Sequence, residues 1–384
     1  MHLLALIHML WRVMTWRKLT AMEECPLQAD TPLPPHAFPQ CALPDSKLSL
    51  LHAPSFLLVH NRLYLALLDQ KQAEIVARNI LTLNFLVVPL SVSDVADIQS
   101  SKGNETFEPP SLGNIFKFDE MASALERKHP RMKLVFQTGP NQTIQLDMAF
   151  LMGCHMIMSH GVGFEETFLA FKNFHSMSKF KSHESADISM TSCWRAFCCA
   201  KCLAWIEFNK VVCNSAHDDK CIHIDEYMHY ASPINGQIHV VVPGKIILFK
   251  APCGDLPPDR LWMDCDGERH FSPTFYADLL HDLGVSLVIG ADEAEYDRSP
   301  FSDRGMDVES LGCRADDGNA LTLQALDRFI TLLDRADGLV AIHCAGRLPY
   351  ACTLLSAYML RRRFFSNPAE AVSWLAMACP GTCV

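Results

Sequence analysis

The chain has 384 residues, enough for two folded domains. Its composition, 49% hydrophobic and 20% charged residues, is that of a globular protein and excludes a disordered one. The net charge of −10 argues against nucleic acid as a main partner, because phosphate-backbone binding needs an excess of lysine and arginine.

The N-terminal segment, residues 1–50, is predicted to be a flexible extension with several prolines between residues 25 and 45. Residues 3–15 are mostly apolar, but the run is too short for a comfortable membrane span and Arg12 interrupts it. It also lacks a clear basic start and a small-residue cleavage site, which a signal peptide needs. We expect no membrane association, with an anchor in this segment as the alternative.

Residues 51–190 are predicted to form a first domain. Residues 92–114 contain Gly-Asn and Pro-Pro pairs and indicate a surface loop. Residues 133–136 are expected to form a strand, and a turn at 139–141 separates it from a helix over about 143–159. The turn at 137–142 contains neither Cys nor Arg.

A helical stretch over about 191–212 is predicted to join the halves, so we assign residues 191–222 to a linker helix. Its cysteines could suggest a metal site: Cys193, Cys198, Cys199 and Cys202. Only one Cys-x-x-Cys pair is present, and no second pair or His-x-x-x-His completes a zinc set. We therefore predict core packing, with no metal and no cofactor. The 16 cysteines of the chain are scattered, which favours a reducing compartment, the cytoplasm or nucleus.

Residues 223–384 are predicted to form a second domain. A helix expected over 319–334 has a one-sided apolar stripe, which consists of Leu323, Leu326, Ile330 and Leu333. The Asp316-Asp317-Gly318-Asn319 cluster before it is typical of a helix N-cap.

The most informative segment follows an apolar run at 338–342, which predicts a buried strand. Apolar residues at helical spacing then predict a helix, on which lie Leu354, Leu355, Tyr358 and Met359. Between them stands His343-Cys344-Ala345-Gly346-Arg347-Leu348. A helix N-terminus offers free N–H groups and a positive dipole, which favour an anion and a thiolate. We interpret Cys344 as a thiolate facing an anion site; the alternative is a His-Cys pair that only packs at a strand end.

This segment resembles the signature loop of the dual-specificity protein phosphatases, His-Cys-x-Ala-Gly-x-Gly-Arg-Thr-Gly. More specifically, the chain resembles the cell-division-cycle-fourteen phosphatases of mitotic exit. The likeness extends to His60–Ala66, Ile224–Tyr230, Val242–Ile246, Ala251-Pro252 and Ala376–Thr382. The resemblance implies an α/β fold of two tandem phosphatase-like domains, each a central mixed sheet flanked by helices, the first without a catalytic cysteine.

The resemblance also implies the roles of individual residues. Cys344 would be the nucleophile, and Asp317, which stands 344 minus 317 or 27 residues before it, would be the general acid. His343 would support the site. The phosphate-binding positions would be Ala345, Gly346, Arg347, Leu348, Tyr350 and Ala351.

The loop departs from the family pattern where phosphate is held. Tyr350 stands six residues after Cys344, where the family has its phosphate-binding arginine. Arg347 and Pro349 replace glycines, Pro349 has no N–H to donate, and Ala351 replaces a hydroxyl residue. Losing one preorganised donor typically costs about 100- to 1000-fold in rate. We predict a weak or inactive phosphatase, with Arg347 as either a substitute phosphate ligand or a solvated loop residue.

Two alternatives remain open: an active phosphoserine, phosphothreonine and phosphotyrosine phosphatase, and a structural interaction protein that binds no phosphate. The implied partners are phosphoproteins with phosphoserine-proline sites and a nearby basic residue. An acidic groove for them would contain Asp218, Asp219, Asp225 and Glu226. The family continues into a glutamine-bearing loop, for which no room remains before Val384, so the resemblance implies a truncated second domain and impaired hydrolysis of a phosphocysteine.

Overall fold

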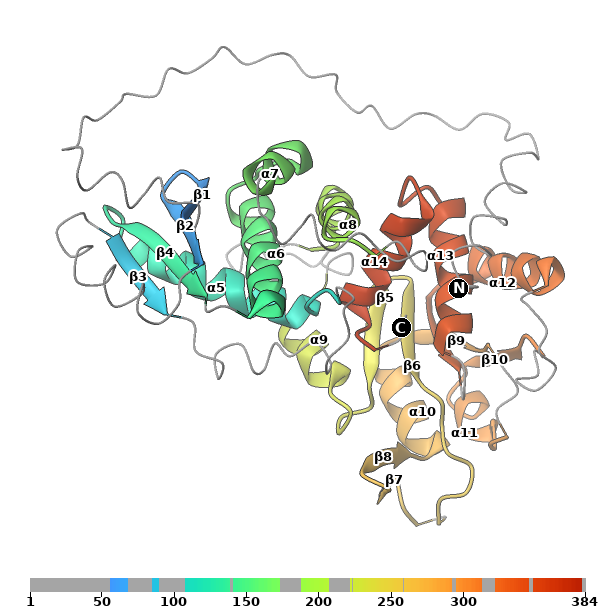
Figure 1. Ribbon diagram of the computed structural model, residues 1–384. Helices are drawn as coiled ribbons and strands as arrows, with labels where there is room; N and C mark the ends of the chain where they lie inside the picture. The colour runs from blue at the N-terminus through green and yellow to red at the C-terminus, as the bar shows by residue number, and fades with distance from the viewer. Residues whose placement is uncertain are drawn as a thin grey trace, which may run out of the picture.

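A computed structural model of the chain describes residues 56–67, 85–89, 108–138, 141–172, 188–206, 222, 224–257, 259–291, 295–312, 322–344 and 348–381. Within these ranges the chain forms two α/β units with helices between them (Figure 1). The predicted extension over residues 1–50 lies outside the described residues. None of the helices in the described ranges is long and apolar enough to cross a membrane.

The first unit contains a sheet with the strand order β1-β2-β4-β3. Its elements are β1 (Phe56–His60), β2 (Leu63–Leu67), β3 (Phe85–Pro89), α5 (Leu112–Lys128), β4 (Lys133–Thr138), α6 (Gln142–Ser159) and α7 (Phe164–Phe171). β1 and β2 form an antiparallel hairpin, while β2 and β3 pair with β4 in parallel. The strand and the helix predicted around residues 133–159 are thus confirmed as β4 and α6.

The second unit contains a sheet with the strand order β10-β9-β11-β6-β5 and a separate hairpin of β7 and β8. Its elements are α9 (Ile224–Ala231), β5 (Ile238–Val242), β6 (Ile246–Lys250), β7 (Trp262–Cys265), β8 (Glu268–Phe271), α10 (Pro273–Asp282), β9 (Val285–Gly290), α11 (Ser299–Ser302), β10 (Asp307–Ser310), α12 (Leu323–Arg335), β11 (Leu339–Cys344), α13 (Leu348–Arg361) and α14 (Pro368–Ala378). β5 is antiparallel to β6, and the remaining pairs of the main sheet are parallel. The sheet is therefore mixed, as predicted.

Helices cover both faces of this second sheet, and its side chains alternate between two cores. On β11, Val340 and Ile342 join the core that includes α12, α13 and α14, whereas Ala341 joins the core that includes α10. Successive side chains of a strand point to opposite faces, so a strand covered on both faces must be apolar throughout. This explains why β11 is apolar from Leu339 to Ile342 on both faces.

Three predicted boundaries are wrong: the start of the helix expected at residue 319, the end of the loop expected at residue 114, and the end of the connecting helix. The helix expected from residue 319 begins at Leu323, because the hydroxyl of Thr322 caps it by accepting from the N–H of Ala325. The Asp316–Asn319 cluster is therefore not its N-cap, and Leu323 is 49% exposed although the predicted stripe placed it in the core. The predicted loop at 92–114 ends earlier, because Ser111 caps α5.

The connecting helix is shorter than predicted. α8 (Met190–Cys202) ends where Ala204 adopts a left-handed conformation with φ 56°. Cys193 is buried, but Cys202 is exposed, so core packing holds for the first cysteine of this helix and not for the last. The domain boundaries at residues 190 and 222 remain predictions.

The two units meet along α8 and α14, which lie between the sheets (Figure 1). Trp194 of α8 is fully buried and donates from Nε1 to the carbonyl of Phe150 on α6 (3.1 Å). Trp374 of α14 donates to the carbonyl of Val241 on β5 (2.9 Å). The hydroxyls of Ser192 and Ser373 connect the two helices at 2.7 Å. One continuous apolar core thus extends across both units.

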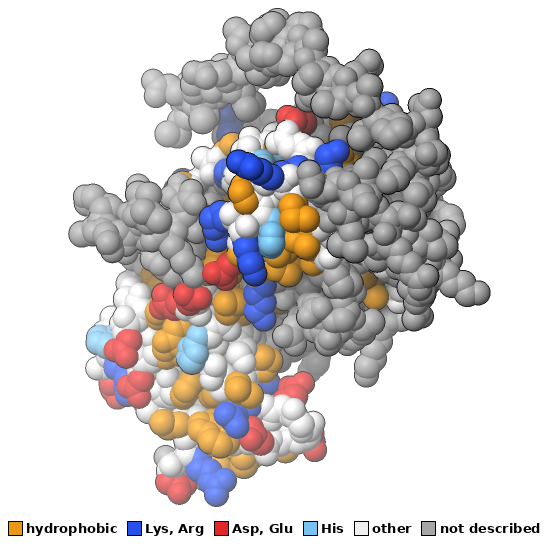
Figure 2. All heavy atoms as spheres, turned by 90° about the vertical axis from the view of Figure 1, so that its left-hand side faces the viewer, with side chains coloured by type: hydrophobic (Ala, Val, Ile, Leu, Met, Phe, Trp, Pro, Cys, Tyr) orange, Lys and Arg blue, Asp and Glu red, His pale blue; other side chains and the backbone are white. Residues whose placement is uncertain are grey.

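The outer faces of the units differ in charge. Figure 2 shows a face on which Lys and Arg side chains gather on the first unit, while acidic, basic and apolar side chains are mixed on the second. Exposed basic residues of the first unit include Lys117, Arg127, Lys128 and Arg131. On this face, the charges of the described residues are therefore unevenly distributed between the two units.

Gly153 provides a test of the contact between α6 and α8, because a Cβ atom there would overlap the indole of Trp194. Gly to Ala inside a helix ordinarily stabilises by about 1 kcal/mol. We expect Gly153→Ala to destabilise instead, by about 1–3 kcal/mol, since the core would be overpacked. Urea unfolding measures the change.

The matched control is Gly153→Ala in a Trp194→Phe background, where the smaller ring leaves room for the methyl group. The added cost of Gly153→Ala should fall there, which a double-mutant cycle detects as a coupling. Equal costs in both backgrounds would contradict the predicted contact.

Candidate active site

Cys344 ends the central strand of the second sheet. β11 lies between β9 and β6, and all three run in parallel. The cysteine therefore stands at the carboxyl edge of parallel strands, where open α/β sheets bind their ligands. It is 5% exposed and contributes to the core beneath this edge. The predicted strand-end position of the cysteine is confirmed.

The segment after Cys344 leads directly into α13, as predicted. Ala345, Gly346 and Arg347 lie outside the described residues, and the helix begins at Leu348. The N-terminus of α13 thus follows the cysteine within a few residues, and its unpaired N–H groups and dipole favour an anion at this edge.

The two altered positions in the first turn of α13 belong to the packed interior. Tyr350 is partly buried and packs against the main core, and Ala351 is fully buried in it. An arginine at position 350 would have to leave this apolar contact to reach a phosphate. Tyr350 therefore stabilises the start of α13 against the core through apolar contact.

His343 is held from several sides beneath the loop. It is 1% exposed, and its Nε2 is hydrogen-bonded to the hydroxyl of Tyr296 at 2.7 Å. Its carbonyl accepts from the N–H of Ala291 (2.9 Å), and its ring lies 5.3 Å from that of Phe249. These contacts fix the orientation of the imidazole next to Cys344, which is consistent with its predicted supporting role.

Sequence reasoning missed Tyr296, which follows β9 and stands 343 minus 296 or 47 residues before its partner. No local spacing links the two residues. Only the parallel pairing of β9 with β11 brings the end of β9 beside His343. The tyrosine had no signal in the sequence that could have identified it.

Lys250 is the cation nearest to Cys344 in the sheet, since the two residues are paired across β6 and β11. Its ammonium group donates to the carboxylate of Glu268 (2.9 Å) and to the carbonyl of Arg269 (3.2 Å). The hydrogen bond from Lys250 lowers the pKa of Glu268. This lysine therefore holds the β7–β8 hairpin against the sheet edge.

Asp317 lies outside the described residues, so its role as general acid stays a prediction. Its segment joins β10 to α12, and β10 is parallel to β9. β10, which precedes this segment, therefore ends at the same edge of the sheet as β11. Asp218 and Asp219 are likewise not described, whereas Asp225 and Glu226 are exposed in the first turn of α9.

The two α/β units in tandem and this strand-to-helix turn define the class of fold, which is that of two phosphatase-like domains. In sequence, the chain is similar to the CDC14 dual specificity phosphatases. It is 25% identical to CDC14C of Symphalangus syndactylus over 296 aligned residues. This alignment covers 74% of this chain and 56% of the relative. To human CDC14C it is 25% identical over 295 residues, 74% of this chain and 61% of the relative.

The chain thus spans little more than half the length of these relatives. No family model matches it. Among solved structures, it is similar to Tk-PTP in the active form, with 16% identity, a TM-score of 0.29, and coverage of 38% of this chain and 86% of that one.

Tyr296→Phe tests whether the tyrosine hydroxyl supports His343. The change removes a buried hydrogen bond, so we expect the free energy of unfolding to fall by about 0.5–1.5 kcal/mol. Thermal unfolding of Tyr230→Phe serves as control, because no hydrogen bond of the Tyr230 hydroxyl occurs within the described ranges. Equal stability of the two variants would contradict a supporting role for Tyr296.

Proposed function

We propose that the chain is a degenerate dual specificity phosphatase that binds phosphorylated protein segments at the edge marked by Cys344 and hydrolyses them weakly or not at all. The observation that carries this proposal is Tyr350, which occupies the position of the phosphate-binding arginine and packs against the core. A bidentate guanidinium normally neutralises the equatorial oxygens during transfer. A phenol in an apolar contact does not supply that charge.

Binding without turnover uses the features that the chain retains. The N-terminus of α13 follows Cys344 and offers N–H groups to an anion. The carboxyl ends of the parallel strands β6, β9 and β11 lie at the edge where Cys344 stands, so an anion bound there would be beside the thiol. The relatives are named as protein phosphatases, so phosphoproteins are the proposed partners.

The proposed partners carry phosphoserine-proline sites with a nearby basic residue. Exposed Asp225 and Glu226 on α9 support this choice, because they offer negative charge near the junction of the two units. We place the protein in the cytoplasm or nucleus, because its 16 scattered cysteines favour a reducing compartment.

An active phosphatase is the second candidate. It is favoured by the retained His343-Cys344 pair, whose histidine is held by Tyr296. In this mechanism the Cys344 thiolate attacks phosphorus, the phosphorus–oxygen bond to the leaving group breaks, and Asp317 gives its proton to the leaving oxygen. Water then attacks the phosphocysteine and releases inorganic phosphate and the thiolate.

Tyr350→Arg tests whether the missing guanidinium limits turnover. Removing one preorganised donor costs about 100- to 1000-fold, so restoring it should raise phosphatase activity on a small aryl phosphate by about tenfold or more. Tyr350→Lys is the matched control, because it adds the charge without the planar fork. Assays should contain a chelator.

Three outcomes separate the candidates. A wild-type rate that falls to background in Cys344→Ser and does not rise in Tyr350→Arg would favour the active phosphatase. Activity that persists in Cys344→Ser would come from contamination or another site. A near-background wild-type rate with a gain only in Tyr350→Arg would support the degenerate site.

Phosphopeptide binding separates the degenerate phosphatase from a purely structural interaction protein. We expect a phosphoserine-proline peptide with a following lysine to bind at least tenfold more tightly than its unphosphorylated form, since charge-assisted hydrogen bonds need the phosphate. Fluorescence anisotropy with the wild type and with Arg347→Ala measures this preference. Equal affinity for both peptides would contradict the proposal, and equal affinity of both proteins would exclude Arg347 as a phosphate ligand.

A further inference from the structure

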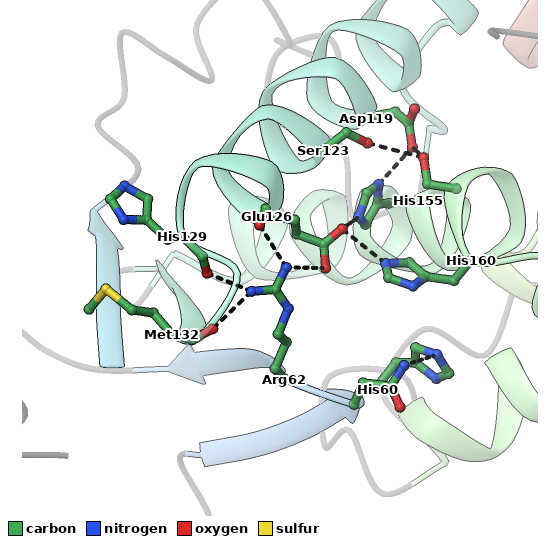
Figure 3. Close-up of polar contacts among 11 residues, drawn as sticks. His60, Arg62, Asp119, Ser123, Glu126, His129, Met132, His155 and His160 are labelled. Atoms are coloured by element: carbon green, nitrogen blue, oxygen red, sulfur yellow. Dashed lines mark hydrogen bonds and ion pairs between the residues drawn. The ribbon is translucent and has the colours of Figure 1, made fainter. Parts of the chain in front are cut away.

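Three potential metal ligands converge in the first unit, away from Cys344. Glu126 lies in the last turn of α5, and His155 lies in the last turns of α6. His160 follows α6 directly as its C-cap residue. Figure 3 shows their side chains pointing toward one another from the ends of the two helices, which pack side by side. We refer to Glu126, His155 and His160 as the histidine cluster.

The spacing within the histidine cluster matches a shared ion. Oε2 of Glu126 lies 3.5 Å from Nε2 of His155 and 3.2 Å from Nε2 of His160. The three ligand atoms, one from each residue of the histidine cluster, all lie within 4.8 Å of one another. Two ligands at about 2.1 Å from a tetrahedral zinc ion lie about 3.4 Å apart. The two measured distances therefore fit adjacent corners of such a site.

Both imidazoles present an unsatisfied nitrogen to this point. Nε2 of His155 and Nε2 of His160 are buried and make no hydrogen bond, and His155 is only 1% exposed. A buried polar atom without a hydrogen-bond partner destabilises the fold. A metal ion would give both nitrogens a partner at once, whereas a single carboxylate oxygen facing two imidazole nitrogens satisfies neither with good geometry.

Asp119 orients the buried histidine. Oδ1 of Asp119 lies 2.6 Å from Nδ1 of His155, and the hydroxyl of Ser159 donates to the same oxygen (2.7 Å). A carboxylate at Nδ1 keeps the proton on that nitrogen and leaves Nε2 free to bind a metal. This carboxylate–histidine pair is the usual outer support of a metal-bound imidazole.

Arg62 fixes the remaining ligand. Its guanidinium donates to the backbone carbonyls of His129 (2.6 Å) and Glu126 (2.8 Å), and it lies 3.8 Å from Oε1 of Glu126. The second carboxylate oxygen, Oε2, is thereby left facing the histidines (Figure 3). The carboxylate would consequently bind a metal through one oxygen.

We propose that Glu126, His155 and His160 form a binding site for a divalent transition metal of the zinc type, with its fourth position open to solvent. Two imidazoles and one carboxylate are a ligand set that zinc accepts. The His160 side chain is 19% exposed, so ions have access from its side. The ion would connect the C-terminal ends of α5 and α6 and so stabilise the first unit.

A metal-free ion network is the competing arrangement. Burial lowers the pKa of His155, but the nearby carboxylates of Asp119 and Glu126 outweigh that effect and raise it overall. A protonated His155 between two carboxylates would account for one of the unsatisfied nitrogens. Protonation of His155 would not change the position of His160, whose Nε2 lies beside Oε2 of Glu126 but makes no hydrogen bond with it.

Cobalt and zinc titrations of the full-length, chelator-treated protein test the proposal. We expect Co²⁺ to give visible absorption of a four-coordinate nitrogen and oxygen site, without the thiolate charge-transfer bands that binding to cysteines would produce. Added Zn²⁺ should displace it, and calorimetry should give one zinc equivalent that His160→Gln and Glu126→Gln each lose. Asp119→Asn should weaken binding by about 10- to 100-fold.

His129→Gln is the matched control, because it changes a histidine beside the histidine cluster while keeping the carbonyl that Arg62 contacts. It should bind zinc like the wild type. Circular dichroism establishes that each variant is folded, and His160→Gln, at the more exposed ligand, keeps the test valid if a change at His155 prevents folding. Identical zinc stoichiometry and affinity in His160→Gln, Glu126→Gln and wild type would overturn the proposal, as would cobalt spectra with thiolate bands alone.

Discussion

The burial of α14 on all sides is the constraint on which the rest of the structure depends. Nearly every residue of this helix is buried, including the carboxylate of Glu370, which accepts from the N–H of Ser366. Helices that are apolar all round can exist only inside a protein. α8 provides one wall and the second unit the other, and the indole of Trp205 lies 5.4 Å from that of Trp374 between them. If either unit were removed, the apolar side chains of α14 that it covers would be exposed to solvent.

This shared core has consequences for the site around Cys344. α13 packs against α14, so the first turn of α13 cannot shift freely toward a bound phosphate. Tyr350 and Ala351 increase that attachment, because both contribute to the core. In a phosphatase loop the same positions must instead be polar and point to the ligand. Under the proposed function, packing at Tyr350 and Ala351 would take the place of anion stabilisation, and fold alone does not establish activity.

The histidine cluster and the candidate active site lie in different units and use different chemistry. The first gathers nitrogen and oxygen ligands at the ends of two helices, whereas the second places a thiol at the carboxyl edge of a sheet. If a metal ion stabilised the first unit, the protein would keep its binding surfaces even where the second unit no longer hydrolysed phosphate. In both sites, the side chains come together because they lie at the ends of helices or strands that pack side by side.

The sequence by itself determined the strand before Cys344 and the helix after it, because local periodicity carries that information. Its resemblance to a known family implied the two-unit α/β plan, and the comparison with the family motif predicts the departure at Tyr350. It misplaced the start of α12, since Thr322 competes with an acidic cluster a few residues earlier as a cap. Only the tertiary structure decided that Tyr296 holds His343 and that Tyr350 enters the core. It alone brought Glu126, His155 and His160 together, because strand pairing and helix packing join residues that no spacing along the chain connects.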